Sequence, residues 1–183
     1  MNNYKLHITK QFNAESLHKG LYIFIYRASR IPPHLGILLN GKLYDISLQG
    51  PNIGLCVDEF CQTIDKRKME TIFIELELPV FNNFIDEILV DCIKKHQKVS
   101  EDVSCLFPIR EFLASVFYNP KMEQADFIFE LMPILEEHKL VKNITQLNLD
   151  KKLNNNILTL NTYTKEDIKN CIAALNRKEE LTC

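Results

Sequence analysis

The chain has 183 residues, enough for one domain with a substantial hydrophobic core. Its 22 basic and 24 acidic residues leave a net charge of −2, without the basic stripe that a nucleic-acid-binding protein usually shows. No stretch reaches the roughly 18 consecutive apolar residues of a membrane span. Composition therefore indicates a globular protein and argues against both nucleic acid as a partner and a membrane span.

The N-terminus and the cysteines indicate the compartment. The first residues, MNNYKLHITKQ, contain no apolar segment of a secretory signal. The six cysteines lack the spacing of a disulfide scaffold, and Cys56 and Cys61 lack the second ligand pair of a zinc site. We therefore expect a cytoplasmic protein with reduced thiols, no metal and no cofactor. The cysteines are Cys56, Cys61, Cys92, Cys105, Cys171 and Cys183.

Strands are predicted in the first half of the chain. Residues 4–9 predict a short edge strand, and residues 21–27, LYIFIYR, predict a central strand rich in β-branched and aromatic residues. Residues 48–54 contain two glycines and a proline and predict a loop. Residues 71–78, TIFIELEL, predict another strand that ends at a proline.

Helices are predicted from residue 57 onward. A short helix is expected over 57–64, an amphipathic helix over 82–97 and a further helix over 106–118. Residues 123–140 are also expected to be helical, with a break or restart at Pro133.

The end of the chain predicts one more strand and one more helix. Residues 155–162 indicate a strand, and the sequence from Thr164 to Asp167 resembles a capping box that opens a helix to about Lys178. Strands followed by helices predict an α+β fold. We expect residues 1–120 to form the core and residues 121–183 to form a mostly helical C-terminal extension packed on it.

One predicted hairpin carries two chemically useful residues. The run IPPHLGILLNGKLYDIS, residues 31–47, turns at Asn40-Gly41, and such a pair between apolar runs is the strongest short-range hairpin signal. His34 begins the first strand, and Asp45 lies on the returning one. We expect the two residues to face each other across the hairpin, so that Asp45 accepts one imidazole N–H of His34 and fixes the tautomer of the ring.

Cys105 is the candidate nucleophile. It follows a polar segment rich in capping residues and precedes the apolar run of 106–118, which places it in the first turn of a helix. The positive end of the helix dipole favours thiolate over thiol there. His34 is the histidine best placed to stabilise the thiolate and to protonate a leaving group. The Cys105 backbone N–H is the expected oxyanion donor.

Three segments occur in a characteristic order: LYIFIYR, then HLGILLNGKLYDIS, then SCLFPIREFL. Their order resembles the circularly permuted NlpC-type papain-like fold, which includes the lecithin–retinol acyltransferase family. The resemblance covers residues 21–118, a little over half of the chain. It implies a papain-like core and thiol-dependent hydrolysis or acyl transfer on an amide or ester bond by Cys105, His34 and Asp45. The implied substrate is a small peptide or a lipid-like acyl donor.

The chain departs from that pattern in ways that keep a second interpretation open. The acyltransferase branch usually has histidine as its third residue, where this chain has Asp45, and NCEHF around the cysteine, where this chain has SCLFP. Residues 121–183 match no segment of the family. The alternative is a catalytically inactive binding or structural module of the same fold, in which Cys105 is a buried core residue.

Other features remain unassigned. Arg27, Arg30 and Arg110 are candidates to line a pocket for an anionic substrate, but surface arginines are common, so they are not placed in the site. The sequence also leaves open whether the chain forms a homo-oligomer.

Overall fold

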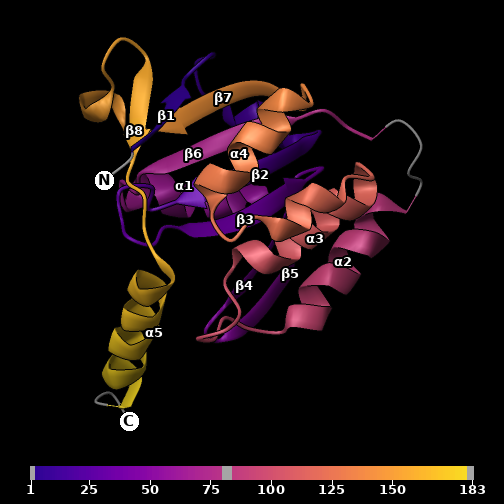
Figure 1. The fold of residues 1–183 in the computed structure, drawn as a ribbon. Helices are drawn as coiled ribbons and strands as arrows, with labels where there is room; N and C mark the ends of the chain where they lie inside the picture. Colours follow the sequence, from indigo (N-terminus) through magenta and orange to yellow (C-terminus); the bar gives the residue numbers. More distant parts are fainter. Residues whose placement is uncertain (1–2, 80–83, 181–183) are drawn as a thin grey trace.

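The computed structural model describes residues 3–79 and 84–180 (Figure 1). Its centre is a six-stranded antiparallel sheet with the strand order β5-β4-β3-β2-β6-β7, and a separate two-stranded ribbon pairs β1 with β8. The strands are β1 (Tyr4–His7), β2 (Leu21–Tyr26), β3 (His34–Leu39), β4 (Lys42–Ser47), β5 (Gly50–Cys56), β6 (Thr71–Leu76), β7 (Val141–Leu147) and β8 (Ile157–Leu160).

The described residues form five α-helices and an antiparallel sheet, with β2 to β5 consecutive in the chain, which confirms the predicted mixed α+β class. Short 3₁₀ turns cover Ala14–His18, Pro120–Gln124 and Asp150–Lys152. The α-helices are α1 (Val57–Lys66), α2 (Ile85–His96), α3 (Leu106–Val116), α4 (Ile128–Glu137) and α5 (Lys165–Glu180). The predicted helix over 82–97 corresponds to α2, although residues 82 and 83 lie outside the described part.

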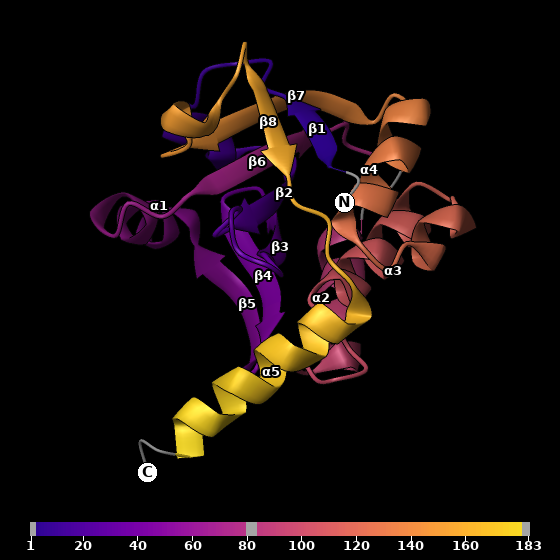
Figure 2. The same cartoon turned by 60° about the vertical axis from the view of Figure 1, so that its left-hand side comes forward.

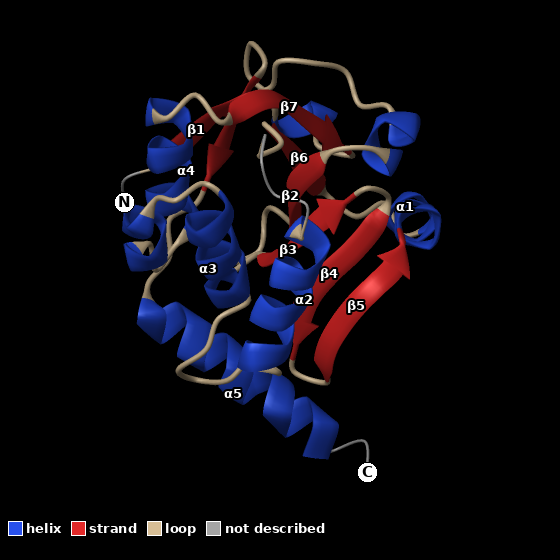
Figure 3. Cartoon of the chain, turned by 90° about the vertical axis from the view of Figure 1, so that its right-hand side faces the viewer, coloured by secondary structure: helices blue, strands red, loops and turns tan. Residues whose placement is uncertain are grey.

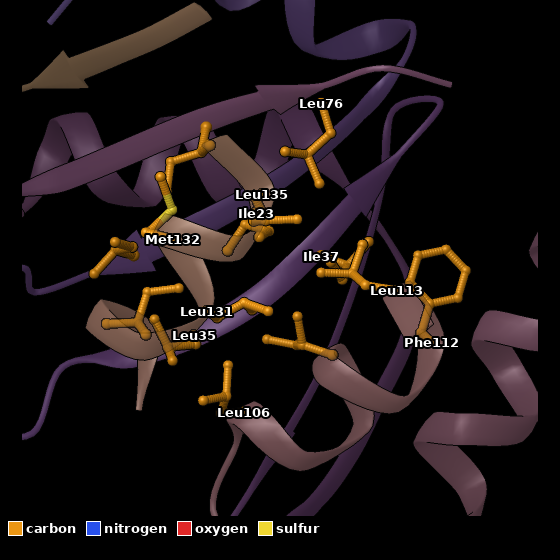
Figure 4. Packing of buried hydrophobic residues seen from close by; sticks show 14 of the residues in the cluster. Ile23, Leu35, Ile37, Leu76, Leu106, Phe112, Leu113, Leu131, Met132 and Leu135 are labelled. Carbon is orange, nitrogen blue, oxygen red and sulfur yellow. The ribbon is translucent and has the colours of Figure 1, made fainter. Parts of the chain in front are cut away.

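Side chains alternate between the two faces of the sheet, as the period of a strand requires. Along β2, Ile23 and Ile25 join the larger core, which α2, α3 and α4 cover, whereas Tyr22 and Phe24 join a smaller core beneath α1. Figure 3 shows α2 and α3 against one face of the sheet, with α1 at the far side. Figure 4 shows side chains of α3 and α4 packed against β2 and β3 in the larger core.

The predicted hairpin is present. β3 and β4 are joined by Asn40 and Gly41, both with positive φ (48° and 79°). A two-residue turn of this kind matches the twist of the flanking strands. The Asn40 side chain also accepts a hydrogen bond from the Gly20 N–H at 3.1 Å, which ties the turn to the start of β2.

The predicted loop over 48–54 is wrong in its greater part, because residues 50–56 form β5. This strand pairs with β4 alone and lies at the edge of the sheet. An edge strand tolerates Pro51 and its two glycines because one side of its backbone needs no partner strand. Glycine and proline therefore mislead the sequence prediction here.

The predicted break at Pro133 is also wrong. α4 runs through Pro133, which lies on the exposed side of the helix, where water can solvate the carbonyl that proline leaves without a donor. The predicted helical segment is instead interrupted before α4, between the 3₁₀ turn that ends at Gln124 and the start of α4 at Ile128. Glu130 accepts hydrogen bonds from the N–H groups of Asp126 and Phe127, which fixes the start of α4.

The last elements match their predictions, but one strand before them was not foreseen. Thr164 and Asp167 exchange hydrogen bonds as a capping box at the start of α5. β7 adds to the sheet beside β6, although the sequence pattern of residues 141–147 predicted no strand. Among the described residues, no helix is long and apolar enough to cross a membrane.

Candidate active site

The hairpin places His34 beside Asp45. His34 is the first residue of β3 and lies opposite Tyr26 of β2, and Asp45 lies on β4. The His34 Nε2 atom is 2.8 Å from Asp45 Oδ2. This hydrogen bond leaves Nδ1 as the ring nitrogen that can exchange a proton with a third group.

Asp45 is held by two partners. Its side chain is only 7% exposed, and a buried carboxylate is stable only when its oxygens are paired. Asn52 of β5 lies directly across from Asp45 and donates through Nδ2 to Asp45 Oδ1 at 2.7 Å. Both carboxylate oxygens therefore have a partner, and the carboxylate is fixed in its orientation toward His34.

Cys105 is the N-cap residue of α3, directly before Leu106, so it lies one position ahead of the first helical turn in which the sequence predicted it. The N–H of Leu106 donates to Ser104 Oγ at 3.3 Å, and the N–H of Phe107 donates to the Ser104 carbonyl at 3.1 Å. The N–H of Cys105 itself donates to no other group within the described residues. That amide is therefore available to a ligand at the helix end.

Cys105 is the third residue at the His34 ring. Burial by itself lowers the pKa of His34, but the interactions of the ring with Asp45 and with the Cys105 side chain outweigh burial and raise that pKa from 6.5 to about 10. This direction of shift favours the protonated imidazole. The structure thus brings together the three residues that the sequence selected.

A single cleft of about 740 Å³ gives access to both His34 and Cys105. Its walls come from the corner before β3, the turn between β4 and β5, the start of α3, and one face of α5. Figure 2 shows α5 crossing the end of the molecule where these segments meet, with its far end projecting beyond the sheet. Much of the wall is apolar, through Ile31, Leu48, Ile168 and Ile172.

Tyr163 also lines the cleft, just before α5. Its ring is nearly buried and packs edge-on against Phe127 and Phe129, with centroids 5.3 and 5.4 Å away. Burial and the neighbouring Cys105 raise the pKa of Tyr163, so its hydroxyl keeps its proton and stays a donor. No sequence signal identifies Tyr163, because it lies in the connection between a predicted strand and a predicted helix.

The space around Gly36 in β3 leaves no room for a side chain. A Cβ atom on Gly36 would lie 2.2 Å from the Phe24 ring and 2.9 Å from the Cβ of Asp45. These separations are far below van der Waals contact. The glycine therefore lets the Phe24 ring pass next to Asp45 and keeps β3 close to its neighbours.

The other sequence candidates do not form a metal site. Within the described residues, no group of three or more His, Cys, Asp or Glu side chains could hold a metal ion. The five described cysteines are all free thiols, which include Cys56 and Cys61.

No protein-family model, curated protein or solved structure matches this chain. The function is therefore argued from the fold and the site geometry. The fold is mixed α+β with a six-stranded antiparallel sheet, and His34, which is paired with Asp45, lines one cleft together with Cys105.

Proposed function

We propose that the chain is a thiol-dependent hydrolase or acyltransferase that acts on an amide or ester bond, built on a papain-like core of the permuted NlpC type. The observation that carries the proposal is the His34 ring, which bonds Asp45 through Nε2 and interacts with Cys105 beside an open cleft. A nucleophile, a base and a group that orients the base are the parts that acyl transfer through a thiol requires.

The reaction follows from these positions. The Cys105 sulfur attacks the substrate carbonyl carbon, and the oxygen that becomes negatively charged accepts a hydrogen bond from the Cys105 N–H. The C–N or C–O bond then breaks, and the leaving amine or alcohol takes a proton from His34. Water or a second alcohol or amine attacks the thioester, gives its proton to His34 and releases the acyl product and the Cys105 thiolate.

Asp45 has a positioning role in this scheme. It accepts the Nε2–H of His34, which leaves Nδ1 as the nitrogen that exchanges a proton in this scheme, and its charge stabilises the imidazolium. Asn52 holds the second oxygen of Asp45. It thus acts on the chemistry through Asp45 and touches no reacting atom.

Alkylation by iodoacetamide tests the proposal. In the intact protein near neutral pH, we expect Cys105 to be labelled fastest, and His34→Ala to slow that labelling by about tenfold or more, because the thiolate loses its imidazolium partner. Mass spectrometry of the labelled peptides gives the rate at each cysteine.

The chain supplies matched references for this experiment. Cys171 lines the same cleft and reports whether the reagent enters it. Burial raises the pKa of Cys61 and of Cys92 to about 11, so both should react slowly. The variant His18→Ala removes a different histidine–aspartate pair, with Asp58, from outside the cleft and should leave the Cys105 rate unchanged. Equal labelling of Cys105 and Cys171, with no effect of His34→Ala, would favour the inactive binding module instead.

A further inference from the structure

Two arginines line the cleft without an acidic partner. Arg27 and Arg30 belong to the same wall as His34. Within residues 3–79 and 84–180, neither guanidinium takes part in an ion pair. A cation that faces a cleft without a counter-charge is available to an anionic ligand.

Arg27 also has an unsatisfied donor. Its Nε atom is buried and has no hydrogen-bond partner among the described residues. Buried side-chain donors almost always have a partner, so an exception needs an explanation. Nε itself is shielded from solvent, so it marks a guanidinium that the protein leaves without a full set of partners rather than an atom that a ligand in the cleft contacts.

The backbone holds the two arginines in place. Arg27 has a φ of 55°, a left-handed conformation that a long side chain seldom adopts, and the N–H of Arg30 donates to the Arg27 carbonyl at 2.8 Å. The two residues are therefore the ends of one tight turn. Arg27 directly follows Tyr26, the residue opposite His34, and its guanidinium carbon lies 5.3 Å from the centre of the Tyr26 ring. The turn thus begins next to the candidate catalytic pair.

The acidic groups of the cleft are already neutralised. Asp126 lines the cleft, but it pairs with Arg110 at 3.0 Å and also with Lys165. Asp45 pairs with His34. Arg110 is committed to Asp126 and to the Ala125 carbonyl, at 2.7 Å. Arg27 and Arg30 are therefore the cations of this wall that remain for a ligand.

We propose that Arg27 and Arg30 bind an anionic group, a carboxylate or a phosphate, on the same molecule whose carbonyl Cys105 attacks. This specificity rests on the proposed function and adds a substrate class to it. The substrate is an acyl compound with one anionic group near the scissile bond and an apolar portion against Ile31 and Ile172.

A pair of alkylating reagents that differ in charge tests the role of the arginines. Iodoacetate carries a carboxylate, and iodoacetamide is its neutral counterpart. We expect the ratio of the iodoacetate rate to the iodoacetamide rate at Cys105 to fall at least about fivefold in Arg27→Gln/Arg30→Gln. The ratio within one variant cancels any change in the reactivity of the thiol. Arg67→Gln removes an exposed arginine from outside the cleft and should leave the ratio unchanged.

The single variant Arg30→Gln covers the case in which the double variant does not fold. Arg30 is exposed, so its side chain can be replaced with little effect on packing. We expect a smaller fall of the same ratio. An unchanged ratio in a folded variant that lacks either or both arginines would overturn the proposal.

A binding measurement separates this proposal from the proposed chemistry. In Cys105→Ser, calorimetric titration with hexanoate, hexyl phosphate and neutral hexanol requires no thiol reaction. We expect one anion to bind at least about tenfold more tightly than hexanol, and Arg27→Gln/Arg30→Gln to abolish the difference. Tighter binding of hexanoate identifies a carboxylate, and tighter binding of hexyl phosphate identifies a phosphate. If neither anion binds more tightly than hexanol, the arginines do not select an anion, whatever Cys105 does.

Discussion

At the scale of single residues, Asp45 shows how the site is held. It is a nearly buried acid on a strand whose other residues are mostly apolar. Such a residue is tolerated because His34 supplies a positive charge and Asn52 supplies an amide donor. Removing either partner leaves a buried oxygen without a hydrogen bond, which makes Asp45, His34 and Asn52 a structural unit.

The protonation of His34 predicts a dependence of stability on pH. Its pKa is raised from 6.5 to about 10 in the folded protein. A raised pKa stabilises the fold fully below 6.5, and this contribution is lost as pH rises from 6.5 toward 10. We therefore expect His34→Gln to lower the free energy of unfolding more at about pH 6 than at about pH 10.

Urea denaturation of both proteins at the two pH values measures this effect. Lysines, tyrosines and other groups that do not interact with His34 titrate alike in both proteins and cancel in the difference, and Cys105→Ser in both proteins removes the thiol that does interact with it. A loss of stability that is equal at both pH values, or larger at the higher one, contradicts a raised pKa for His34.

The close packing around Gly36 predicts a loss of stability when a larger residue replaces it. Gly36→Ala forces a methyl group against the Phe24 ring and Asp45, and overpacking of this kind costs about 1–3 kcal/mol. Urea denaturation measures the loss, and Cys105 labelling should slow as Asp45 shifts. Phe24→Leu replaces the ring with a smaller side chain. In that background, Gly36→Ala should lower the free energy of unfolding by less. An equal cost in both backgrounds would show that Phe24 is not the obstacle.

The sequence could predict the three central residues but not their support. His34 and Asp45 follow from a hairpin whose turn is fixed by Asn40 and Gly41, and the structure has that hairpin. Asn52 was missed because its strand contains residues that usually break strands. Tyr163 was missed because nothing in its neighbourhood indicates that it approaches a cysteine nearly sixty positions earlier.

At the scale of elements, α5 contributes a wall to the cleft. Ile168, Cys171, Ile172 and Leu175 recur at helical spacing and all line the cavity. Ile172 is only 5% exposed, whereas Leu175 is 39% exposed. The helix is thus attached by a short apolar stripe near its start.

A charge in that stripe should release the helix. We expect Ile172→Glu to raise amide hydrogen exchange over residues 165–177 by about tenfold or more, because a carboxylate cannot be buried there without a partner. Cys171 labelling should accelerate as well. Ala173→Glu places the same charge on the exposed side of the helix and should change neither measurement. Unchanged exchange in Ile172→Glu would mean that this side chain does not hold α5.

Elements were predictable where the pattern was local. The start of α5 follows from a capping box within four residues, and β2 follows from six consecutive apolar and aromatic residues. The start of α4 depends on Glu130 reaching back to two backbone amides, and β5 depends on β4 beside it. These boundaries are set by partners that a propensity pattern does not contain.

At the scale of the whole molecule, segments far apart in the sequence pair with each other. Among the described residues, the first strand, β1, pairs with the last strand, β8, in register from Tyr4↔Leu160 to His7↔Ile157. β7 completes the sheet beside β6, which lies about seventy positions earlier in the chain. Pairings over such separations are not encoded in any local pattern, which is why the α+β class was predictable and this arrangement was not.

The composition of the cleft wall has a consequence for how the protein is made. Residues 26–49 and 99–106 supply His34, Cys105 and part of the wall, and residues 163–175 complete it. During synthesis, the thiol and the imidazole leave the ribosome well before Tyr163 and α5 do. A nascent chain therefore carries His34 and Cys105 without their enclosing wall, and the complete cleft forms only after residues 163–175 have emerged from the ribosome.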